Sequence, residues 1–279
     1  MKFPKIAILG GGQLGRMMIQ EGMNYNLEFA VLDPDPQAPC SKIVDEFVVG
    51  SLKDFDTVYQ FGKGREILTI EIEHINIEAL EKLESEGVKI IPSPKILKTI
   101  QNKRWQKEFY QQHKIPTCPF VVCTNKADLT SKLDFLPAFQ KLEKDGYDGK
   151  GVQFLKDEND LSFAFDAPSI LEQSVEIEKE ISIIIARNQR GEIAIYPSVE
   201  MEFDPMLNLV DTLVSPAAIS PAIENECRAL ATRVAEAFQL EGILAVELFL
   251  TKKGEVLVNE VAPRAHNSGH HTIEACFTS

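Results

Sequence analysis

Short apolar runs alternate with amphipathic stretches through the first third of the chain. The runs with the length of buried strands are Lys5–Leu9, Glu28–Leu32, Phe47–Val49, Glu66–Ile70 and Val88–Ile91. Between them, Gln13–Glu21 and Ile77–Glu86 carry apolar residues at helical spacing. Strands and helices that alternate in this way predict an α/β fold, in which a parallel sheet has helices on both faces.

The pattern changes after Pro92 and Pro94, which interrupt the apolar periodicity, and we place a domain boundary near residue 98. Helices are expected at Lys103–His113 and at Ala222–Phe238. The expected strands are Ile170–Val175, Glu180–Arg187, Glu192–Val199 and a hairpin of Gly242–Leu250 with Glu255–Val261. Antiparallel strands that are not interleaved with helices predict an α+β fold for this part.

The charge of the chain excludes several functional classes. Its 29 Lys and Arg residues against 42 Asp and Glu residues give a net charge of −13, so we expect no nucleic-acid partner, which would need a basic face. No apolar run approaches the roughly 18 residues of a membrane-spanning helix, so we expect no membrane partner. The 5 cysteines form no C-x-x-C pair, which favours reduced thiols and a cytoplasmic protein.

A glycine-rich turn, Gly10–Gly15, follows the first predicted strand and opens the first predicted helix. It fits the pattern G-x-G-x-x-G, and Asp33 ends the second strand, as in a dinucleotide site. The other interpretation is a tight turn that packs the helix against the sheet. No catalytic half of a nicotinamide-dependent oxidoreductase is recognisable, so the dinucleotide site is kept as the alternative.

A second glycine-rich segment, Gly146–Gly151, carries Tyr147 and Lys150 and follows Lys141. Glycines let a backbone bend over a ligand and turn its amides toward phosphate oxygens, and lysine adds a positive charge. We therefore predict a phosphate-binding loop. A flexible surface turn is the alternative, which the aromatic ring of Tyr147 disfavours.

The hairpin near the end of the chain predicts a metal site. A two-residue turn at Lys253-Gly254 would place Glu247 opposite Glu260 and Leu248 opposite Asn259. Like charges directly opposite each other destabilise a sheet, and a divalent cation between the carboxylates removes that repulsion. We therefore expect Mg²⁺ between the two glutamates. In the alternative, the register differs by one residue and one glutamate faces water.

Polar side chains also follow the predicted strand Glu66–Ile70. Ligands of open α/β sheets bind beyond the carboxyl ends of the strands, and the glycine turn lies at the same edge. We therefore expect Gln13, Leu14 and Glu73 to share one small-molecule site. An exposed acidic loop is the alternative.

A dense polar run, Arg264–His271, follows the last predicted strand. Such a run is typical of a binding loop. No Glu-x-x-His framework supports a histidine metal site here. We favour anion binding through Arg264 and the amides of Asn267-Ser268.

Taken together, these motifs resemble one enzyme family. The matching segments are GGGQLGRM (10–17), EIEH (71–74), QNKRWQK (101–107), GYDGKG (146–151), ILEQSVEIEKEISIIIARN (170–188), LAVELFLT (244–251) and VNEVAPRAHNSGHHTIEA (258–275). The chain resembles the 5-(carboxyamino)imidazole ribonucleotide synthases, ATP-grasp enzymes of purine biosynthesis. The resemblance implies a Rossmann-like α/β domain (pre-ATP-grasp) at 1–98 and an α+β ATP-grasp domain with lobes at 99–170 and 171–279.

The resemblance also implies a reaction and its partners. Bicarbonate would attack the γ-phosphate of ATP to give carboxyphosphate, and the exocyclic amine of 5-aminoimidazole ribonucleotide would capture the carboxyl group or released CO₂. ATP and Mg²⁺ are the implied cofactors, with bicarbonate as a co-substrate. A cytoplasmic homodimer that acts in IMP biosynthesis is the family expectation.

Carried onto matching positions, the resemblance assigns site residues. Catalysis is assigned to Asp148, Lys150 and Arg264, and the Mg²⁺ ligands are Glu247 and Glu260. The ribonucleotide contacts are Gln13, Leu14, Glu73, Tyr147, His266, Asn267 and Ser268. The ATP contacts are Lys103, Lys141, Gly146, Tyr147, Asp148, Gly149, Lys150, Gly151, Val152, Glu172, Gln173, Ser174, Val175, Glu180, Asn259 and Glu260. Among these, Glu172 and Val175 would meet adenine through backbone groups, and Glu180 would meet the ribose.

The chain departs from the family pattern at several points. Glu200–Phe203 stands where relatives carry a histidine, and His271 stands where they carry a tryptophan. The sequence stops at Ser279, before the small β-rich domain that the family pattern adds. Three alternatives stay open: another ATP-grasp carboxylate–amine ligase, an NAD-linked oxidoreductase built on Gly10–Gly15, and a nucleotide-binding module without activity.

Overall fold

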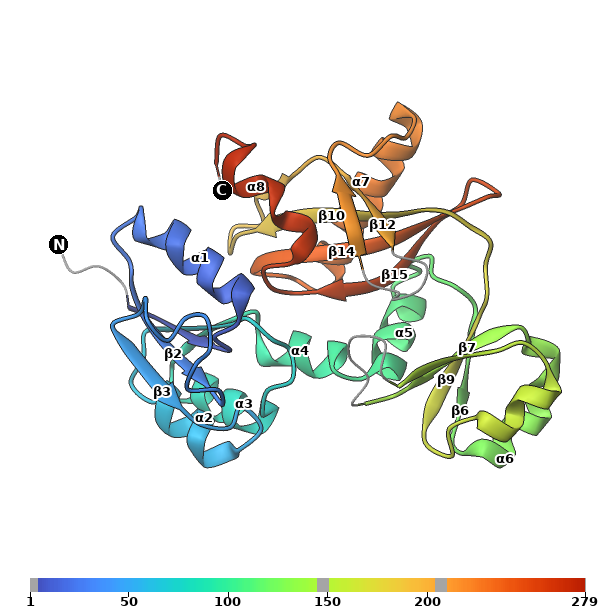
Figure 1. The fold of residues 1–279 in the computed structure, drawn as a ribbon, viewed down its shortest axis with the longest axis horizontal. Helices are drawn as coiled ribbons and strands as arrows, with labels where there is room; N and C mark the ends of the chain where they lie inside the picture. The colour runs from blue at the N-terminus through green and yellow to red at the C-terminus, as the bar shows by residue number, and fades with distance from the viewer. Residues whose placement is uncertain (1–4, 145–150, 204–209, 279) are drawn as a thin grey trace.

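The computed structural model describes residues 5–144, 151–203 and 210–278 and arranges them around three sheets (Figure 1). The first third of the chain forms a parallel sheet in the order β3-β2-β1-β4-β5. Its strands are β1 (Lys5–Leu9), β2 (Glu28–Asp33), β3 (Glu46–Val49), β4 (Ile67–Ile70) and β5 (Lys89–Ile91). The predicted parallel α/β fold is confirmed.

Helices cover both faces of this sheet because the residues of β1 alternate between the faces. Ile8 packs with Ile19 on one face, whereas Leu9 packs with Val58 and Leu80 on the other. The helices are α1 (Gln13–Met23), α2 (Phe55–Gly62), α3 (Ile77–Ser85) and α4 (Pro94–Ile100). A strand with apolar residues on both faces therefore needs helices on both sides.

Sequence periodicity misses α2 and α4. The first begins after Asp54, whose side chain accepts a hydrogen bond from the Thr57 amide and caps the helix. Pro94, interpreted from the sequence as a domain break, stands instead in the first turn of α4, where the missing N–H costs nothing. The boundary expected near residue 98 therefore falls inside a helix.

A four-stranded antiparallel sheet follows, in the order β6-β9-β7-β8. Its strands are β6 (Phe120–Cys123), β7 (Ala138–Leu142), β8 (Val152–Leu155) and β9 (Ser169–Gln173). One face packs Cys123, Leu155 and Leu171 against α6 (Lys126–Leu129) and the 3-10 segments η1 (Thr130–Phe135) and η2 (Glu158–Phe163). The opposite face is left to line the site described below.

The third sheet has six strands in the order β13-β12-β10-β14-β15, with β11 beside β10. They are β10 (Ile177–Arg187), β11 (Ile193–Ile195), β12 (Val199–Phe203), β13 (Val210–Val214), β14 (Gly242–Thr251) and β15 (Val256–Ala262). Helix α7 (Pro221–Ala237) covers one face, where Val234 joins Ile183 and Val246. The single strand predicted at Glu192–Val199 is wrong. Pro197 lies between β11 and β12 and cannot donate a ladder hydrogen bond.

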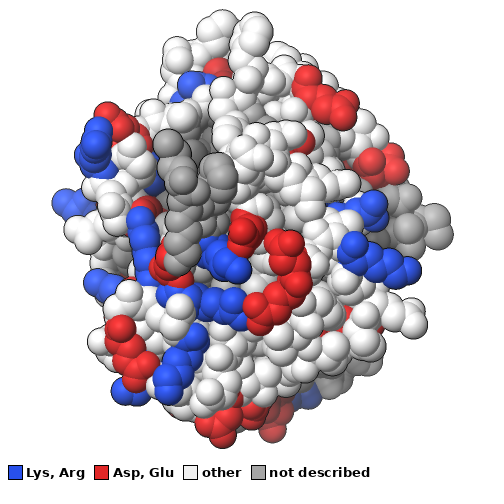
Figure 2. All heavy atoms as spheres, turned by 90° about the vertical axis from the view of Figure 1, so that its left-hand side faces the viewer, with Lys and Arg blue, Asp and Glu red and all other residues white. Residues whose placement is uncertain are grey.

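The remaining elements connect these sheets. Helix α5 (Lys103–Gln112) follows α4, and η3 (Asn267–Gly269) and α8 (His271–Glu274) follow β15. No helix within the described ranges is long and apolar enough to cross a membrane. On the face of the molecule in Figure 2, Lys and Arg side chains lie among Asp and Glu side chains, so charges of both signs are intermixed there.

Helix α4 belongs to two cores at once. Leu97 is fully buried in the core of the parallel sheet. Ile96 and Ile100 pack instead in the core between α7 and the third sheet. The stability of the first sheet and that of the third are therefore linked through one short helix.

We predict that Leu97→Ala lowers the free energy of unfolding by about 2–5 kcal/mol, because it leaves a cavity in a fully buried position. Lys95→Ala, at an exposed position of the same helix, should change it by less than about 0.5 kcal/mol. Urea denaturation followed by circular dichroism measures both variants. Equal losses would contradict the assignment of α4 to the core.

Candidate active site

One cavity of about 680 Å³ is lined by residues of both antiparallel sheets, of the start of α5 and of the loop that follows β4 of the parallel sheet. The sequence-predicted residues on its wall are Glu73, Lys103, Lys141, Val152, Glu172, Gln173, Ser174, Val175, Glu180, Glu247, Asn259, Glu260, Arg264, His266 and Asn267. A large concave cavity toward which charged groups converge is the expected place for a ligand.

The pairing of β10 with β14 puts carboxylates on the cavity face of the third sheet. Glu180 and Ser182 share one face of β10, and Ser182 lies opposite Glu247 of β14. The alternate residues Ile181 and Ile183 are fully buried in the core with α7. Burial of the isoleucines therefore fixes the direction of the glutamates.

The turn between β14 and β15 differs from the prediction. Gly254 has a φ of +81°, and its N–H donates to the Thr251 carbonyl. The loop is a three-residue one that ends in a left-handed glycine, instead of a two-residue turn. The extra residue shifts the register, so Leu248 lies opposite Val258 and the predicted pairing with Asn259 is wrong.

A bulge in β15 then brings the two glutamates back to one site. The register shifts between Val246 and Leu248, so Asn259 and Glu260 together oppose Glu247. Neighbouring strand residues normally point to opposite faces, but at a bulge both can line the same cavity. Glu247 and Glu260 thus share the cavity, although not as the direct cross-strand pair that the sequence predicts.

Each of these glutamates has a basic neighbour. Lys103 Nζ lies 3.1 Å from Glu260 Oε2, and His266 Nε2 lies 3.2 Å from Glu247 Oε1. The Lys103 ammonium lowers the pKa of Glu260 to about 2, and Glu260 raises the pKa of Lys103. Both members of this ion pair are therefore charged at neutral pH.

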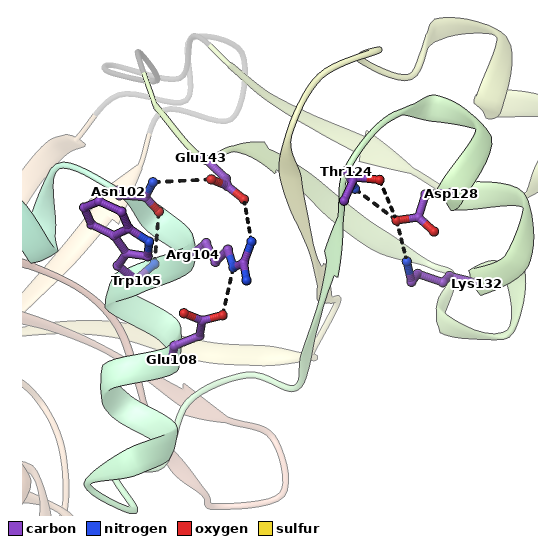
Figure 3. Close-up of polar contacts among 8 residues, drawn as sticks. All are labelled: Asn102, Arg104, Trp105, Glu108, Thr124, Asp128, Lys132 and Glu143. Carbon is purple, nitrogen blue, oxygen red and sulfur yellow. Dashed lines mark hydrogen bonds and ion pairs between the residues drawn. The ribbon is translucent and has the colours of Figure 1, made fainter.

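The residues on either side of Lys103, Asn102 and Arg104, make polar contacts that fix the first turn of α5 (Figure 3). The Asn102 side chain accepts from the Trp105 N–H, which caps the helix, and it donates to the Glu143 carboxylate. The Lys103 N–H donates to the Glu143 carbonyl at 2.9 Å, and Arg104 lies 3.7 Å from the Glu143 carboxylate. The segment after β7 therefore holds the start of α5 in place.

Lys141 and Glu172 meet on the cavity side of the four-stranded sheet. Lys141 Nζ lies 2.8 Å from Glu172 Oε1. Glu172 is paired with Phe120 of β6 and Phe139 of β7, so its backbone lies inside the sheet. Its side chain contacts the lysine of the cavity, and the backbone contact with adenine that the family resemblance assigns to Glu172 stays a prediction.

An apolar wall lies beside these charges. The rings of Phe139 and Phe154 pair across β7 and β8 with their centroids 5.1 Å apart. Gln173, Ser174 and Val175, at the end of β9, line the same part of the cavity. Flat apolar surface beside the end of a strand suits a planar base.

The glycine turn Gly10–Gly15 is filled by side chains of the protein itself. The Gly12 N–H donates to the Glu71 carboxylate, and the Gly11 N–H donates to Asp33 Oδ2 at 2.7 Å. A Cβ on Gly12 would lie 2.5 Å from Glu71 Oε1, so a side chain there would force the carboxylate to move. Because a carboxylate already occupies the N-terminus of α1, the geometry opposes the pyrophosphate of a dinucleotide at this place.

Arg264 connects the third sheet to the parallel sheet. Its Nε lies 2.8 Å from Glu73 Oε1, and both side chains are mostly buried. The resemblance assigns ribonucleotide contacts to Glu73 and to the loop after the last strand, and this ion pair joins those two parts of the chain. Gln13 and Leu14, in the first turn of α1, are not among the described residues that line the cavity.

Ser268 holds the loop after β15 instead of facing the cavity. Its side chain is buried and its Oγ lies 2.7 Å from Ser182 Oγ. His266 Nδ1 lies 2.8 Å from the same hydroxyl. Ser268 therefore orients His266, which does line the cavity.

Five predicted site residues lie outside the described residues, namely Gly146, Tyr147, Asp148, Gly149 and Lys150. The roles assigned to them, including catalysis by Asp148 and Lys150, stay predictions. Gly151 is described, with a φ of +74°, and its carbonyl accepts from the Leu142 N–H at 2.8 Å.

Sequence reasoning assigns no role to Lys107, although the segment QNKRWQK contains it. Lys107 follows Lys103 by one turn of α5, and residues at this spacing share a helix face. The spacing of the two lysines is the signal that could have revealed it.

Family models match both parts of the chain. The ribonucleotide synthetase preATP-grasp domain matches residues 2–101, and the ATP-grasp domain matches residues 108–279. The N5-carboxyaminoimidazole ribonucleotide synthetase of Thermotoga maritima is 42% identical, with a TM-score of 0.90 over 99% of this chain and 73% of its own. The synthase of Bacillus subtilis is 34% identical over 98% of this chain and 73% of its own. The chain belongs to the N5-carboxyaminoimidazole ribonucleotide synthase family.

Other members of the synthase family differ in length or have been solved with ligands. The chloroplastic phosphoribosylaminoimidazole carboxylase of Vigna aconitifolia is 38% identical over 98% of this chain and 50% of its own. The chain spans about half the length of the first curated relatives it matches. The synthase of Aspergillus clavatus, solved with ADP and 5-aminoimidazole ribonucleotide, is 32% identical with a TM-score of 0.88 over 98% of this chain and 73% of its own.

We predict that Glu180 makes the metal-free protein less stable as the pH rises. Burial and the neighbouring Glu247 raise the pKa of Glu180 from 4.5 to about 7. Between these values the folded protein keeps a proton that the unfolded chain has lost, so the free energy of unfolding falls with increasing pH. Relative to wild type, Glu180→Gln should gain about 1–3 kcal/mol between about pH 5 and pH 8.

Urea unfolding at both pH values, with a chelator present, measures this gain. Glu178→Gln, at an exposed position of the same strand, is the matched control and should follow wild type. A difference between wild type and Glu180→Gln that stays constant over this range would show that Glu180 titrates normally.

Proposed function

We propose that this chain uses ATP and bicarbonate to carboxylate the exocyclic amine of 5-aminoimidazole ribonucleotide, a step of purine (IMP) biosynthesis. One observation carries the proposal: a single cavity extends from Lys141 past Glu260 to Glu73. This cavity gives a phosphoryl donor and an acceptor access to the same space. Membership of the synthase family and the ligands of the Aspergillus clavatus enzyme support the choice of substrates.

ATP fits the part of the cavity between the two antiparallel sheets. Lys103 and Lys141 supply positive charge for the phosphates, which must be neutralised during phosphoryl transfer. Phe139 and Phe154 supply apolar surface for the base. Glu180 stands on the same wall as a hydrogen-bond acceptor for the ribose.

The carboxylates of the hairpin fit Mg²⁺. Glu247 and Glu260 offer oxygen ligands, and Mg²⁺ is usually bound by one or two carboxylates together with substrate phosphates. In the part of the chain that the structure describes, no group of three or more His, Cys, Asp or Glu side chains is arranged to hold a metal. ATP phosphates would therefore complete the coordination. When bound there, Mg²⁺ would neutralise charge on the phosphoryl group.

Bicarbonate and the ribonucleotide fit the end of the cavity near the parallel sheet. Arg264, held by Glu73, presents a guanidinium that can pair with an oxyanion. His266 and Asn267 line the same end and offer polar groups to the ribonucleotide.

The proposed reaction has two steps. A bicarbonate oxygen attacks the γ-phosphorus of ATP, the bond to the β–γ bridging oxygen breaks, and ADP leaves with carboxyphosphate formed. The exocyclic amine then attacks the carboxyl carbon, or CO₂ released from it. Phosphate departs and the amine loses a proton. Because carboxyphosphate is unstable, the site must exclude water during the transfer.

Phosphate release from ATP and bicarbonate with Mg²⁺, measured with and without 5-aminoimidazole ribonucleotide, tests the proposal. We expect release to depend on the ribonucleotide and labelled bicarbonate carbon to enter the product. Release that depends on a different amine would indicate another ATP-grasp ligase. A change in NADH absorbance would instead indicate a nicotinamide-dependent oxidoreductase. The Glu71 carboxylate, which accepts the Gly12 N–H where a dinucleotide phosphate would bind, argues against that activity.

The homodimer and the cytoplasmic location that the family resemblance implies remain predictions. Size-exclusion chromatography with light scattering checks the first of them. A mass of 31.2 kDa, that of one chain, would contradict the dimer.

We predict that Glu260→Gln weakens ATP binding in the presence of Mg²⁺ by about tenfold or more, because one carboxylate ligand is lost. Binding without Mg²⁺ should change much less. Glu255 is an exposed glutamate next to the turn of the same hairpin, so Glu255→Gln is the control and should bind ATP like wild type. Isothermal titration calorimetry gives the affinities. An unchanged affinity of Glu260→Gln for ATP with Mg²⁺ would contradict the assignment of Glu260 as a metal ligand.

A further inference from the structure

We infer that Lys107 is a positioning residue: it neutralises Glu172 from the protein interior and so leaves the charge of Lys141 available to the phosphates of ATP. The inference rests on the proposed function, since it concerns the ATP part of the cavity.

Three charged side chains form a row that leads from the interior to the cavity, in the order Lys107, Glu172 and Lys141. Glu172 Oε2 lies 2.5 Å from Lys107 Nζ, and Glu172 Oε1 lies 2.8 Å from Lys141 Nζ. The side chains of Lys107 and Glu172 are each 3% exposed, against 15% for Lys141. Of the two lysines, Lys141 is therefore the one that can meet a ligand.

The net charge of this row depends on Lys107. Two ammonium groups and one carboxylate leave one positive charge, which reaches the cavity at Lys141. Without Lys107, the Glu172 carboxylate would neutralise Lys141 alone, and the phosphates would meet a neutral ion pair. Burial by itself would raise the pKa of Glu172, but Lys141 and Lys107 outweigh it and hold that pKa below its usual range.

A second contact fixes the Lys107 ammonium. Lys107 Nζ donates to Thr117 Oγ1 at 2.6 Å, and Thr117 Oγ1 donates to the Val258 carbonyl at 2.6 Å. Val258 stands directly before Asn259 and Glu260 in β15. The same ammonium therefore touches both the strand of Glu172 and, through Thr117, the strand that carries a proposed metal ligand.

Stability alone gives no reason for an ammonium at this position. Burial lowers the pKa of Lys107, and the attraction of Glu172 opposes this shift. Replacing a buried ion pair by apolar side chains of similar volume is often neutral or stabilising. What an apolar side chain could not supply at this position is the positive charge.

Calorimetric titration with ATP and Mg²⁺ tests the inference on four proteins: wild type, Lys107→Met, the double variant Lys107→Met with Glu172→Gln, and the control Lys95→Met. We expect Lys107→Met to bind ATP about tenfold more weakly or worse. The double variant removes the unneutralised carboxylate, so its affinity should return to within about threefold of wild type. The control Lys95→Met, at an exposed position of α4, should bind ATP with the affinity of wild type. Lys107→Gln carries the same expectation if the methionine variant does not fold.

Each other outcome overturns the inference. Wild-type affinity in Lys107→Met would show that the charge of Lys107 is not needed. A double variant as weak as the single one would show that Lys107 does not act through Glu172. A merely structural role would lower the unfolding midpoint without this rescue of affinity. If wild type itself fails to bind ATP, the proposed function fails, and the inference falls with it.

Discussion

The extra residue of β15 opposite Glu247 is the feature on which the site depends. With regular pairing, Asn259 and Glu260 would point to opposite faces, and Glu260 would be forced into the apolar core that packs against α7. The bulge keeps the Glu260 carboxylate out of the core and directs it toward Lys103. That ion pair joins the hairpin to α5, whose first turn is held by the segment after β7. One local irregularity therefore connects the third sheet, through α5, to the four-stranded sheet.

Regular features could be predicted from the sequence, and local departures from regularity could not. The alternation of strands and helices suffices for the parallel sheet. Glu247 is predicted from the hairpin, whereas Glu180 is assigned only by the family resemblance. Periodicity describes the average exposure of a strand, so it cannot reveal a bulge or a left-handed Gly254 that shifts the register. The role of Lys107 is not predicted for another reason. A charged side chain is expected at the surface, and the burial of Lys107 depends on a partner in a distant strand.

The glycine motif shows why a short pattern does not decide a function. The backbone from Gly10 to Gly15 has the form of a phosphate-binding turn, and the parallel sheet has a matching strand order. The deciding group is Glu71, which lies 59 residues from Gly12 in the sequence and reaches the Gly12 amide from the position directly after β4. A carboxylate there gives the helix N-terminus the negative partner that a phosphate would otherwise supply.

A helix shared between two cores also limits how the parts of the chain can move. Rotating the parallel sheet against the third sheet would pull Leu97 out of one core or Ile96 and Ile100 out of the other. Exposing even one such side chain costs about 1.5–3 kcal/mol. The four-stranded sheet packs on a core of its own. A displacement of that sheet would therefore leave Leu97, Ile96 and Ile100 buried in their cores.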